Sequence, residues 1–101
     1  MKNIKSIIKK RIQKFIEIDA DGIRKHILSI FLKVKGATVD DIYENIKEKY
    51  KISKTATAAM IGYIYSKIRI LHAYKKSYKS LTIYSLKSEY INLIETELKS
   101  V

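Results

Sequence analysis

Apolar residues in the first third of the chain recur with the period of an α-helix. Over residues 2–18, isoleucines and one phenylalanine form one stripe, and lysines lie mainly on the other side. The pattern breaks at residues 19–22, which offer a fresh cap, and resumes over about 21–35. Gly36 then stands where a helix usually ends with a positive φ. The pattern predicts two amphipathic helices, the second one closed by Gly36.

Two further helices are predicted from capping residues followed by helical periodicity. Thr38 begins the third helix, and Asp41 stands three residues later in an approximate capping box. The carboxylates in its first turn suit the positive end of the helix dipole. After a short turn, Ser53 can cap a fourth helix over about residues 54–68. One sector of this helix is apolar, and the opposite sector holds small and polar residues.

After residue 70 the period of the pattern changes from that of a helix to two. The alternating runs at about 71–76 and 81–86 predict a β-hairpin. The connection between them has no glycine, so we expect a loose loop of several residues. A last helix is expected over residues 88–99, with Ser88 as its cap.

The order of elements predicts a mainly α protein with a small β-hairpin (α+β). Helices two to four with the hairpin, over residues 20–87, are interpreted as a winged helix-turn-helix, and the helices at 2–18 and 88–99 are additions to it. The 101 residues, of which 47% are apolar, fit one domain with its own core.

Two stretches of the chain resemble known families. They are Thr38-Val39-Asp40-Asp41-Ile42-Tyr43-Glu44 with Ser53 and a helix ending in Ile70-Leu71, and Ala58-Ala59-Met60-Ile61-Gly62-Tyr63-Ile64 followed by Ser66-Lys67-Ile68-Arg69-Ile70-Leu71. The first resembles the winged-helix domain of many small regulators, including the DNA-binding domain of ferric-uptake regulators, whose metal-sensing part is missing here. The second resembles a family of small archaeal winged-helix proteins of unknown function, over roughly residues 22–95. Arg69 stands where such sequences commonly turn with glycine, so we expect a different corner between helix and strand.

The charge of the chain is strongly positive and unevenly distributed. The formal net charge is +11, from 21 basic and 10 acidic residues. No carboxylate side chain lies between Glu48 and Glu89. The cations in that window are Lys49, Lys51, Lys54, Lys67, Arg69, Lys75, Lys76, Lys79 and Lys87. Because neutralising phosphates releases condensed counterions, nucleic acid is the leading partner. An anionic membrane and an acidic protein surface are the alternatives.

A DNA-binding site is predicted on the fourth helix and the hairpin. In a winged helix the fourth helix would enter the major groove and the hairpin lysines would hold the phosphate backbone. The predicted contacts are Lys51, Lys54, Thr55, Ala58, Ala59, Tyr63, Ser66, Lys67, Lys75, Lys76, Tyr78 and Lys79. The helix has no Arg, Asn or Gln, the side chains that read bases best. We therefore expect a regulator that contacts phosphates well and reads few bases directly.

Each of these features has a second interpretation. The small residues of the fourth helix could pack closely against a partner helix, which would make the domain a protein-interaction module. The hairpin lysines could form a solvated turn that prevents edge-to-edge strand pairing. RNA binding is a weaker third hypothesis, in which tyrosines stack on bases.

The basic N-terminal helix also allows more than one role. Its apolar stripe can pack on the C-terminal helix or on a second copy of the chain, and we expect a homodimer through the terminal helices. Extra DNA contacts and binding to a membrane surface are the alternatives.

The sequence offers no pattern for catalysis, a cofactor or a metal. His26 and His72 are the only histidines and there is no cysteine, so a zinc site would need scattered carboxylates. Asp40, Asp41 and Glu44 are better explained by the helix dipole than by a metal. No nucleophile has a neighbouring base. We expect a non-enzymatic protein that, without cysteine, a membrane span or a signal peptide, is cytoplasmic.

Overall fold

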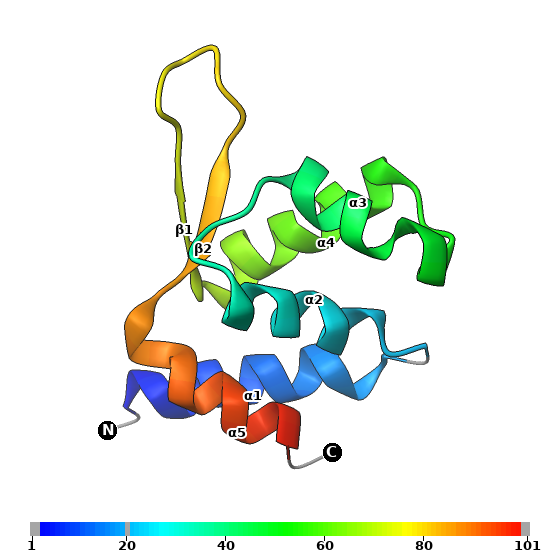
Figure 1. Cartoon of the computed structure of the whole chain (residues 1–101). Helices are drawn as coiled ribbons and strands as arrows, with labels where there is room; N and C mark the ends of the chain where they lie inside the picture. Colours follow the sequence, from blue (N-terminus) through cyan, green and yellow to red (C-terminus); the bar gives the residue numbers. More distant parts are fainter. Residues whose placement is uncertain (1–2, 20, 100–101) are drawn as a thin grey trace.

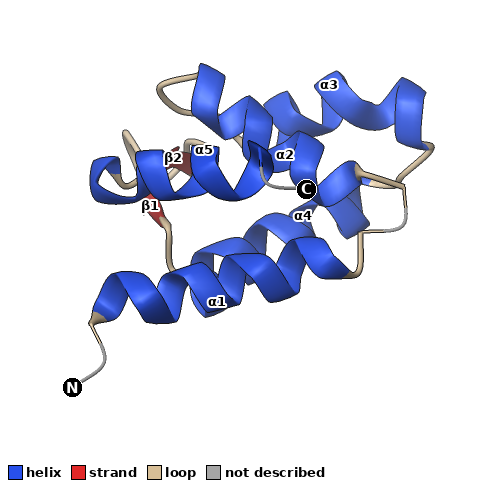
Figure 2. Ribbon diagram, turned by 90° about the horizontal axis from the view of Figure 1, so that it is seen from below, coloured by secondary structure: helices blue, strands red, loops and turns tan. Residues whose placement is uncertain are grey.

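The computed structural model describes residues 3–19 and 21–99, which form a stack of helices from which one hairpin projects (Figure 1). Helices α1 (Ile4–Glu17) and α5 (Ile91–Lys99) contact each other and α2 (Ile23–Lys33). On the other side of α2 lie α3 (Val39–Tyr50) and α4 (Lys54–Tyr63), which pack together. Figure 1 shows α1 and α5 at the end of the molecule opposite the tip of the hairpin, and Figure 2 views the molecule from that end. The predicted mainly α fold with a small hairpin is confirmed.

The starts of α1, α3 and α4 follow from local capping by side chains. The Asn3 side chain accepts a hydrogen bond from the Ser6 N–H at 2.9 Å. The capping box of α3 is complete, because the Thr38 hydroxyl accepts from the Asp41 N–H at 3.1 Å and the Asp41 carboxylate accepts from the Thr38 N–H at 2.9 Å. Ser53 caps α4 by accepting from the Ala56 N–H at 3.0 Å. The caps predicted at Thr38 and Ser53 are confirmed, and the cap at Asn3 was not predicted.

Gly36 does not cap α2, and this prediction is wrong. The helix ends at Lys33, and Val34 is already extended with a φ of −115°. The positive φ of 82° belongs to Gly22, which precedes α2. A Cβ atom at Gly36 would lie 2.9 Å from Ile83 Cγ2. Gly36 therefore allows the chain after α2 to approach the hairpin closely. The approach places Ala37 in a β-bridge with Tyr84, closed by hydrogen bonds of 2.9 and 2.8 Å.

The predicted helix over 54–68 is continuous but changes its hydrogen bonding. Residues Lys54–Tyr63 are α-helical, and Ile64–Ile68 form a π-helical turn, η1. The Arg69 N–H closes this turn by donating to the Ile64 carbonyl at 2.9 Å. Arg69 itself has a φ of 66°, a conformation that costs a non-glycine residue roughly 1 kcal/mol. The corner between η1 and β1, where similar sequences commonly have glycine, is thus formed by an arginine with a strained backbone.

The hairpin consists of β1 (Leu71–Tyr74) and β2 (Ile83–Leu86), which pair antiparallel from Leu71↔Leu86 to Tyr74↔Ile83. The strands are shorter than expected, and residues 75–82, called the hairpin loop below, connect them. Its turn is closed by a hydrogen bond from the Ser80 N–H to the Ser77 carbonyl at 3.1 Å. The predicted loose loop is confirmed.

The last helix begins with a 3-10 turn, η2 (Ser88–Tyr90), and continues as α5 to Lys99. Ser88 is the first residue of that turn, and the residue before it, Lys87, makes no capping hydrogen bond through its side chain. The prediction that Ser88 is the cap is therefore wrong, although the helical range is confirmed.

The core joins the two terminal helices to the rest of the molecule. Ile12 of α1, Ile27 of α2 and Ile94 of α5 are each 0% exposed and belong to one apolar cluster. The apolar stripes of α1 and α5 thus cover each other within a single chain. No helix within residues 3–19 and 21–99 is long and apolar enough to cross a membrane.

Candidate functional site

All the residues predicted to contact DNA are exposed. They come from the turn after α3, from α4 with η1, and from the hairpin loop. The exposed residues are Lys51, Lys54, Thr55, Ala58, Ala59, Tyr63, Ser66, Lys67, Lys75, Lys76, Tyr78 and Lys79. Thr57, Ile61 and Ile64, on the other side of the same helix, are 0% exposed and anchor it to the core. As the sequence predicted, one sector of the helix is therefore buried and the opposite sector is exposed.

The small-residue face of α4 is not covered within the described chain. Ala58 and Ala59 are exposed. A Cβ atom added at Gly62 would have no atom within 4 Å. The small residues therefore do not serve close packing between the helices of one chain. The face, defined as Lys54, Thr55, Ala58, Ala59, Tyr63, Ser66 and Lys67 and called the α4 face below, is open to a partner.

Lys54, a cation of the carboxylate-free window, has a carboxylate beside it in the folded chain. Lys54 Nζ lies 2.7 Å from Asp40 Oδ1, in the first turn of α3. The hydrogen bond and the charge of Asp40 raise the pKa of Lys54. The ammonium therefore stays charged, but it already has an anionic partner. The start of the α4 face is consequently less positive than the sequence window indicated.

Tyr63 has a structural role in addition to its exposure. Its ring stacks on Phe15 of α1 with centroids 5.8 Å apart and an angle of 13° between the planes. Arg24 of α2 also lies over the Phe15 ring, at 4.7 Å from the centroid, and donates to the Phe15 carbonyl at 2.9 Å. Tyr63 remains 50% exposed. One face of the Tyr63 ring thus ties α4 to α1, and the rest of the side chain faces solvent.

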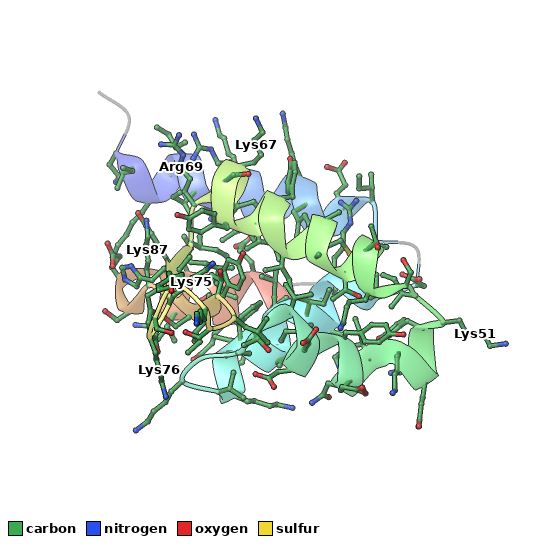
Figure 3. The ribbon with its side chains drawn as sticks, turned by 90° about the horizontal axis from the view of Figure 1, so that it is seen from above. Lys51, Lys67, Arg69, Lys75, Lys76 and Lys87 are labelled. Atoms are coloured by element: carbon green, nitrogen blue, oxygen red, sulfur yellow. The ribbon has the colours of Figure 1, made fainter. Side chains whose placement is uncertain are left out.

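The hairpin loop carries charge and an aromatic ring away from the body of the protein. Tyr78 is 85% exposed, and Lys79 Nζ lies 5.7 Å from the centroid of its ring. Lys75 and Lys76 lie on the same projection (Figure 3). Among the residues that the structure describes, none of these lysines forms a salt bridge. The loop therefore presents unpaired positive charge.

The cations of the window occupy different ends of the surface seen in Figure 3. Lys75, Lys76 and Lys87 lie around the hairpin, and Lys67 and Arg69 lie beyond it toward α1. Lys51 lies at the opposite end of the molecule. The fold thus brings most of these charges to the hairpin end and leaves Lys51 apart from them.

Sequence reasoning did not find a groove beside the base of the hairpin. It has a volume of about 490 Å³. Its lining residues are Tyr65, Ser66, Arg69, Leu71, His72, Ala73 and Lys87. Only Ser66 was among the predicted contacts. Arg69 and Lys87 are far apart in sequence, and the pairing of Leu71 with Leu86 brings their neighbourhoods together. In the sequence, this groove was indicated by the fact that Arg69 and Lys87 both belong to the carboxylate-free window.

His26 lies outside these surfaces, on α2. Its Nδ1 atom is 3.1 Å from the Tyr50 hydroxyl, and the two rings meet edge to face with centroids 5.4 Å apart. Burial lowers the pKa of His26, and the positive charges of Lys49 and Lys33 lower it further. The contact joins α2 to the end of α3.

Comparison with known proteins identifies a family. Residues 12–94 match the model of the family described as "Protein of unknown function (DUF2551)". An uncharacterized protein of Archaeoglobus fulgidus is 32% identical over 88 residues, which cover 86% of this chain and 88% of that protein. No solved structure matches the chain. The expected likeness to a family of unknown function is confirmed, and one relative is archaeal; the winged-helix part of the expectation stays a prediction.

Proposed function

The chain belongs to the DUF2551 family, and from its geometry we propose that it is a winged-helix protein that binds duplex DNA as a transcriptional regulator. One observation carries the proposal. The α4 face is open, its C-terminal end in η1 contacts β1 at the base of the hairpin, and the lysines of the projecting hairpin loop have no salt-bridge partner within the described chain. A helix and a cationic hairpin on one side of a small domain suit the groove and the backbone of a duplex.

The order of elements supports the winged-helix interpretation. Three helices, α2 to α4, are followed directly by the antiparallel pair β1 and β2. The bridge between Ala37 and Tyr84 attaches β2 to the segment before α3. The hairpin is therefore fixed at its base, while its loop extends beyond the helices (Figure 1). Such an arrangement can hold a loop against a phosphate backbone while a helix occupies the groove.

The proposed mechanism is electrostatic docking with limited direct readout. Lys67, Lys75, Lys76 and Lys79 would hold phosphates, and Thr55, Ala59 and Ser66 would approach base edges. Because alanine and hydroxyl side chains discriminate bases weakly, specificity would depend on DNA shape and on the spacing of two subunits. Lys54 would contribute less than its position indicates, because Asp40 already holds it.

The proposal includes a homodimer formed through the terminal helices. Since α1 and α5 already cover each other, a second copy would have to use the positions that they leave exposed. Ile4 and Ile18, at the two ends of α1, are 66% and 69% exposed and are apolar. Sedimentation at several protein concentrations tests for the homodimer. A monomer at every concentration would contradict the homodimer but would leave DNA binding by one subunit possible.

The test compares two triple charge reversals by fluorescence anisotropy with a random-sequence duplex at several salt concentrations. The first changes Lys75, Lys76 and Lys79 to Glu. The matched control changes Lys5, Lys9 and Lys99 to Glu, which are exposed lysines of the terminal helices. Each reversal removes two charges, so both variants fall from the same formal charge of +11 to +5.

We expect the hairpin-loop variant to lose affinity for all duplexes and to show a flatter dependence of affinity on salt. The slope is about −0.9 for each phosphate neutralised, so the loss of three contacts should be measurable. The control variant should lose less affinity and keep most of the slope. Equal behaviour of the two variants would mean that net charge alone governs binding, and would contradict a contact by the hairpin loop.

A second function is favoured by the chemistry of the α4 face. Its exposed Ala58 and Ala59 and its lack of Arg, Asn and Gln suit the docking of a partner helix. Under this alternative the domain is a protein-interaction module. Purification of the protein from its natural host after nuclease treatment distinguishes DNA binding from protein interaction. The interaction module would be favoured by one stoichiometric protein partner that is lost in the Ala59→Lys variant, together with no binding to duplex DNA at moderate salt.

A further inference from the structure

The groove at the base of the hairpin collects basic side chains from three separate segments. Arg69 follows the π-helical turn, His72 lies on β1, and Lys87 follows β2. Among residues 3–19 and 21–99, no carboxylate side chain lines this groove. Its volume of about 490 Å³ lies within the range of ordinary ligand sites, although it is open to solvent. Figure 3 shows Arg69 and Lys87 at the hairpin end of the molecule.

The donors of the groove are free to bind a ligand. Within residues 3–19 and 21–99, neither Arg69 nor Lys87 forms a salt bridge. The Arg69 Nε–H points to the Ser66 carbonyl at 3.5 Å, and its terminal NH₂ groups make no hydrogen bond to the described residues. Ser66 is not a free donor, because its hydroxyl donates to the Gly62 carbonyl at 2.8 Å. The available charged or titratable nitrogen donors are a guanidinium, an ammonium and an imidazole, and Tyr65, which carries a hydroxyl, also lines the groove.

The backbone at Arg69 combines a π-helical turn with a positive φ at a residue that lines the groove. The residue closes a π-helical turn with a φ of 66° and a ψ of 42°, where glycine would be unstrained. Both π-turns and strained non-glycine residues concentrate at functional sites. An arginine at this corner has a cost in strain, and its side chain lines the groove. The strain is explained if the guanidinium binds a ligand, because glycine has no side chain to do so.

We propose that the groove binds a phosphate group. The fork of the Arg69 guanidinium matches two phosphate oxygens, Lys87 supplies a compact positive charge, and His72 can donate a ring N–H. A phosphate of a nucleic-acid backbone and a small phosphorylated molecule offer the same oxygens. The proposal does not depend on contacts by the α4 face or the hairpin loop, and inorganic phosphate is a sufficient first probe.

The sharpest variant is Arg69→Gly, because it removes the cation and relaxes the backbone at the same time. Lys51→Gly is its matched control: Lys51 is also basic, has a φ of 50°, ends a helix, and lies far from the groove. Both variants lose one positive charge and one strained residue. Lys87→Gln is a second variant that leaves the corner unchanged.

The first measurement is a titration of the ¹⁵N-labelled protein with potassium phosphate, against potassium chloride at equal ionic strength, followed by amide NMR shifts. We expect saturable shifts around residues 69–73 and 87 in the natural chain and in Lys51→Gly. In Arg69→Gly the affinity should fall about tenfold or more, which is the loss expected for one bidentate guanidinium–phosphate pair. Lys87→Gln should weaken binding too. Shifts that chloride reproduces, or equal affinity in Arg69→Gly and Lys51→Gly, would overturn the proposal.

The second measurement identifies the source of the phosphate. If the groove holds a backbone phosphate, Lys87→Gln should weaken duplex binding more than the control Lys99→Gln, which changes an exposed lysine of α5, even with the hairpin-loop lysines intact. If it holds a small phosphorylated ligand, these two glutamine variants should bind duplex DNA equally, while inorganic phosphate still distinguishes them. Failure of the hairpin-loop variant to affect DNA binding would leave this site untouched, so the two proposals fail separately.

Discussion

Asp40 and Lys54 form a salt bridge of 2.7 Å that joins the first turn of α3 to the first turn of α4. Asp40 lies in the acidic stretch before the carboxylate-free window, and Lys54 lies within it. The fold therefore brings a negative charge to the start of the surface proposed to face DNA. Removing that charge should strengthen the proposed interface.

Asp40→Asn is expected to raise the affinity for duplex DNA at low salt, because it releases Lys54 and removes repulsion from phosphates. Glu95→Gln is the matched control, since it also removes one exposed carboxylate but lies on α5. Fluorescence anisotropy of both variants measures the effect. Equal gains in the two would show that only net charge matters, and no gain in Asp40→Asn would place the interface elsewhere.

Gly36→Ala is expected to destabilise the fold by about 1–3 kcal/mol, the usual cost of overpacking. Its Cβ would lie 2.9 Å from Ile83 Cγ2, which belongs to a β-branched side chain with restricted rotamers. Gly62→Ala is the control, because its Cβ would meet nothing within 4 Å and alanine favours a helix by about 0.8–1.0 kcal/mol. Urea denaturation should show opposite changes, and a neutral Gly36→Ala would mean that the hairpin can move away from it.

The stability of the protein is expected to depend on the protonation of His26. Because its pKa is lowered in the folded state, the unfolded chain binds the proton more readily. The stabilisation is therefore present above the unfolded pKa of about 6.5 and is lost as the pH falls from there through the lowered folded pKa.

Urea midpoints at pH 7.5 and 5.5 test this expectation. His26→Gln keeps a side chain able to meet the Tyr50 hydroxyl but has no proton to gain. The natural chain should lose more stability between the two pH values than the variant. Parallel losses would assign the pH dependence to other groups.

Ile12→Ala is expected to lower the free energy of unfolding by about 2–5 kcal/mol, because Ile12 is 0% exposed in the core that joins α1 to the rest of the protein. Ile4→Ala, at a position 66% exposed on the same helix, should change stability by no more than about 0.5 kcal/mol. A small effect at Ile12 in chemical denaturation would mean that α1 packs only loosely on the domain.

Features that depend on neighbouring residues were predictable from the sequence. The capping box joins Thr38 to Asp41 across three residues, and Ser53 caps α4 across the same interval, so the interacting groups are close in any helical conformation. The buried and exposed sectors of α4 followed from periodicity in the same way. Gly36 shows the limit of such rules, because its role is set by Ile83, which lies far along the chain.

The sequence by itself determined which segments are helical, where α3 and α4 begin, that the chain ends in a hairpin and a helix, and that its middle third is positively charged. Local hydrogen bonding, side-chain periodicity and composition are sufficient for these features. Only the tertiary structure decided that α1 and α5 cover each other, that Asp40 holds Lys54, and that Arg69 and Lys87 share one groove. Those relations join residues that are distant in sequence, and only the packing of the helices and the register of the hairpin bring them within reach of one another.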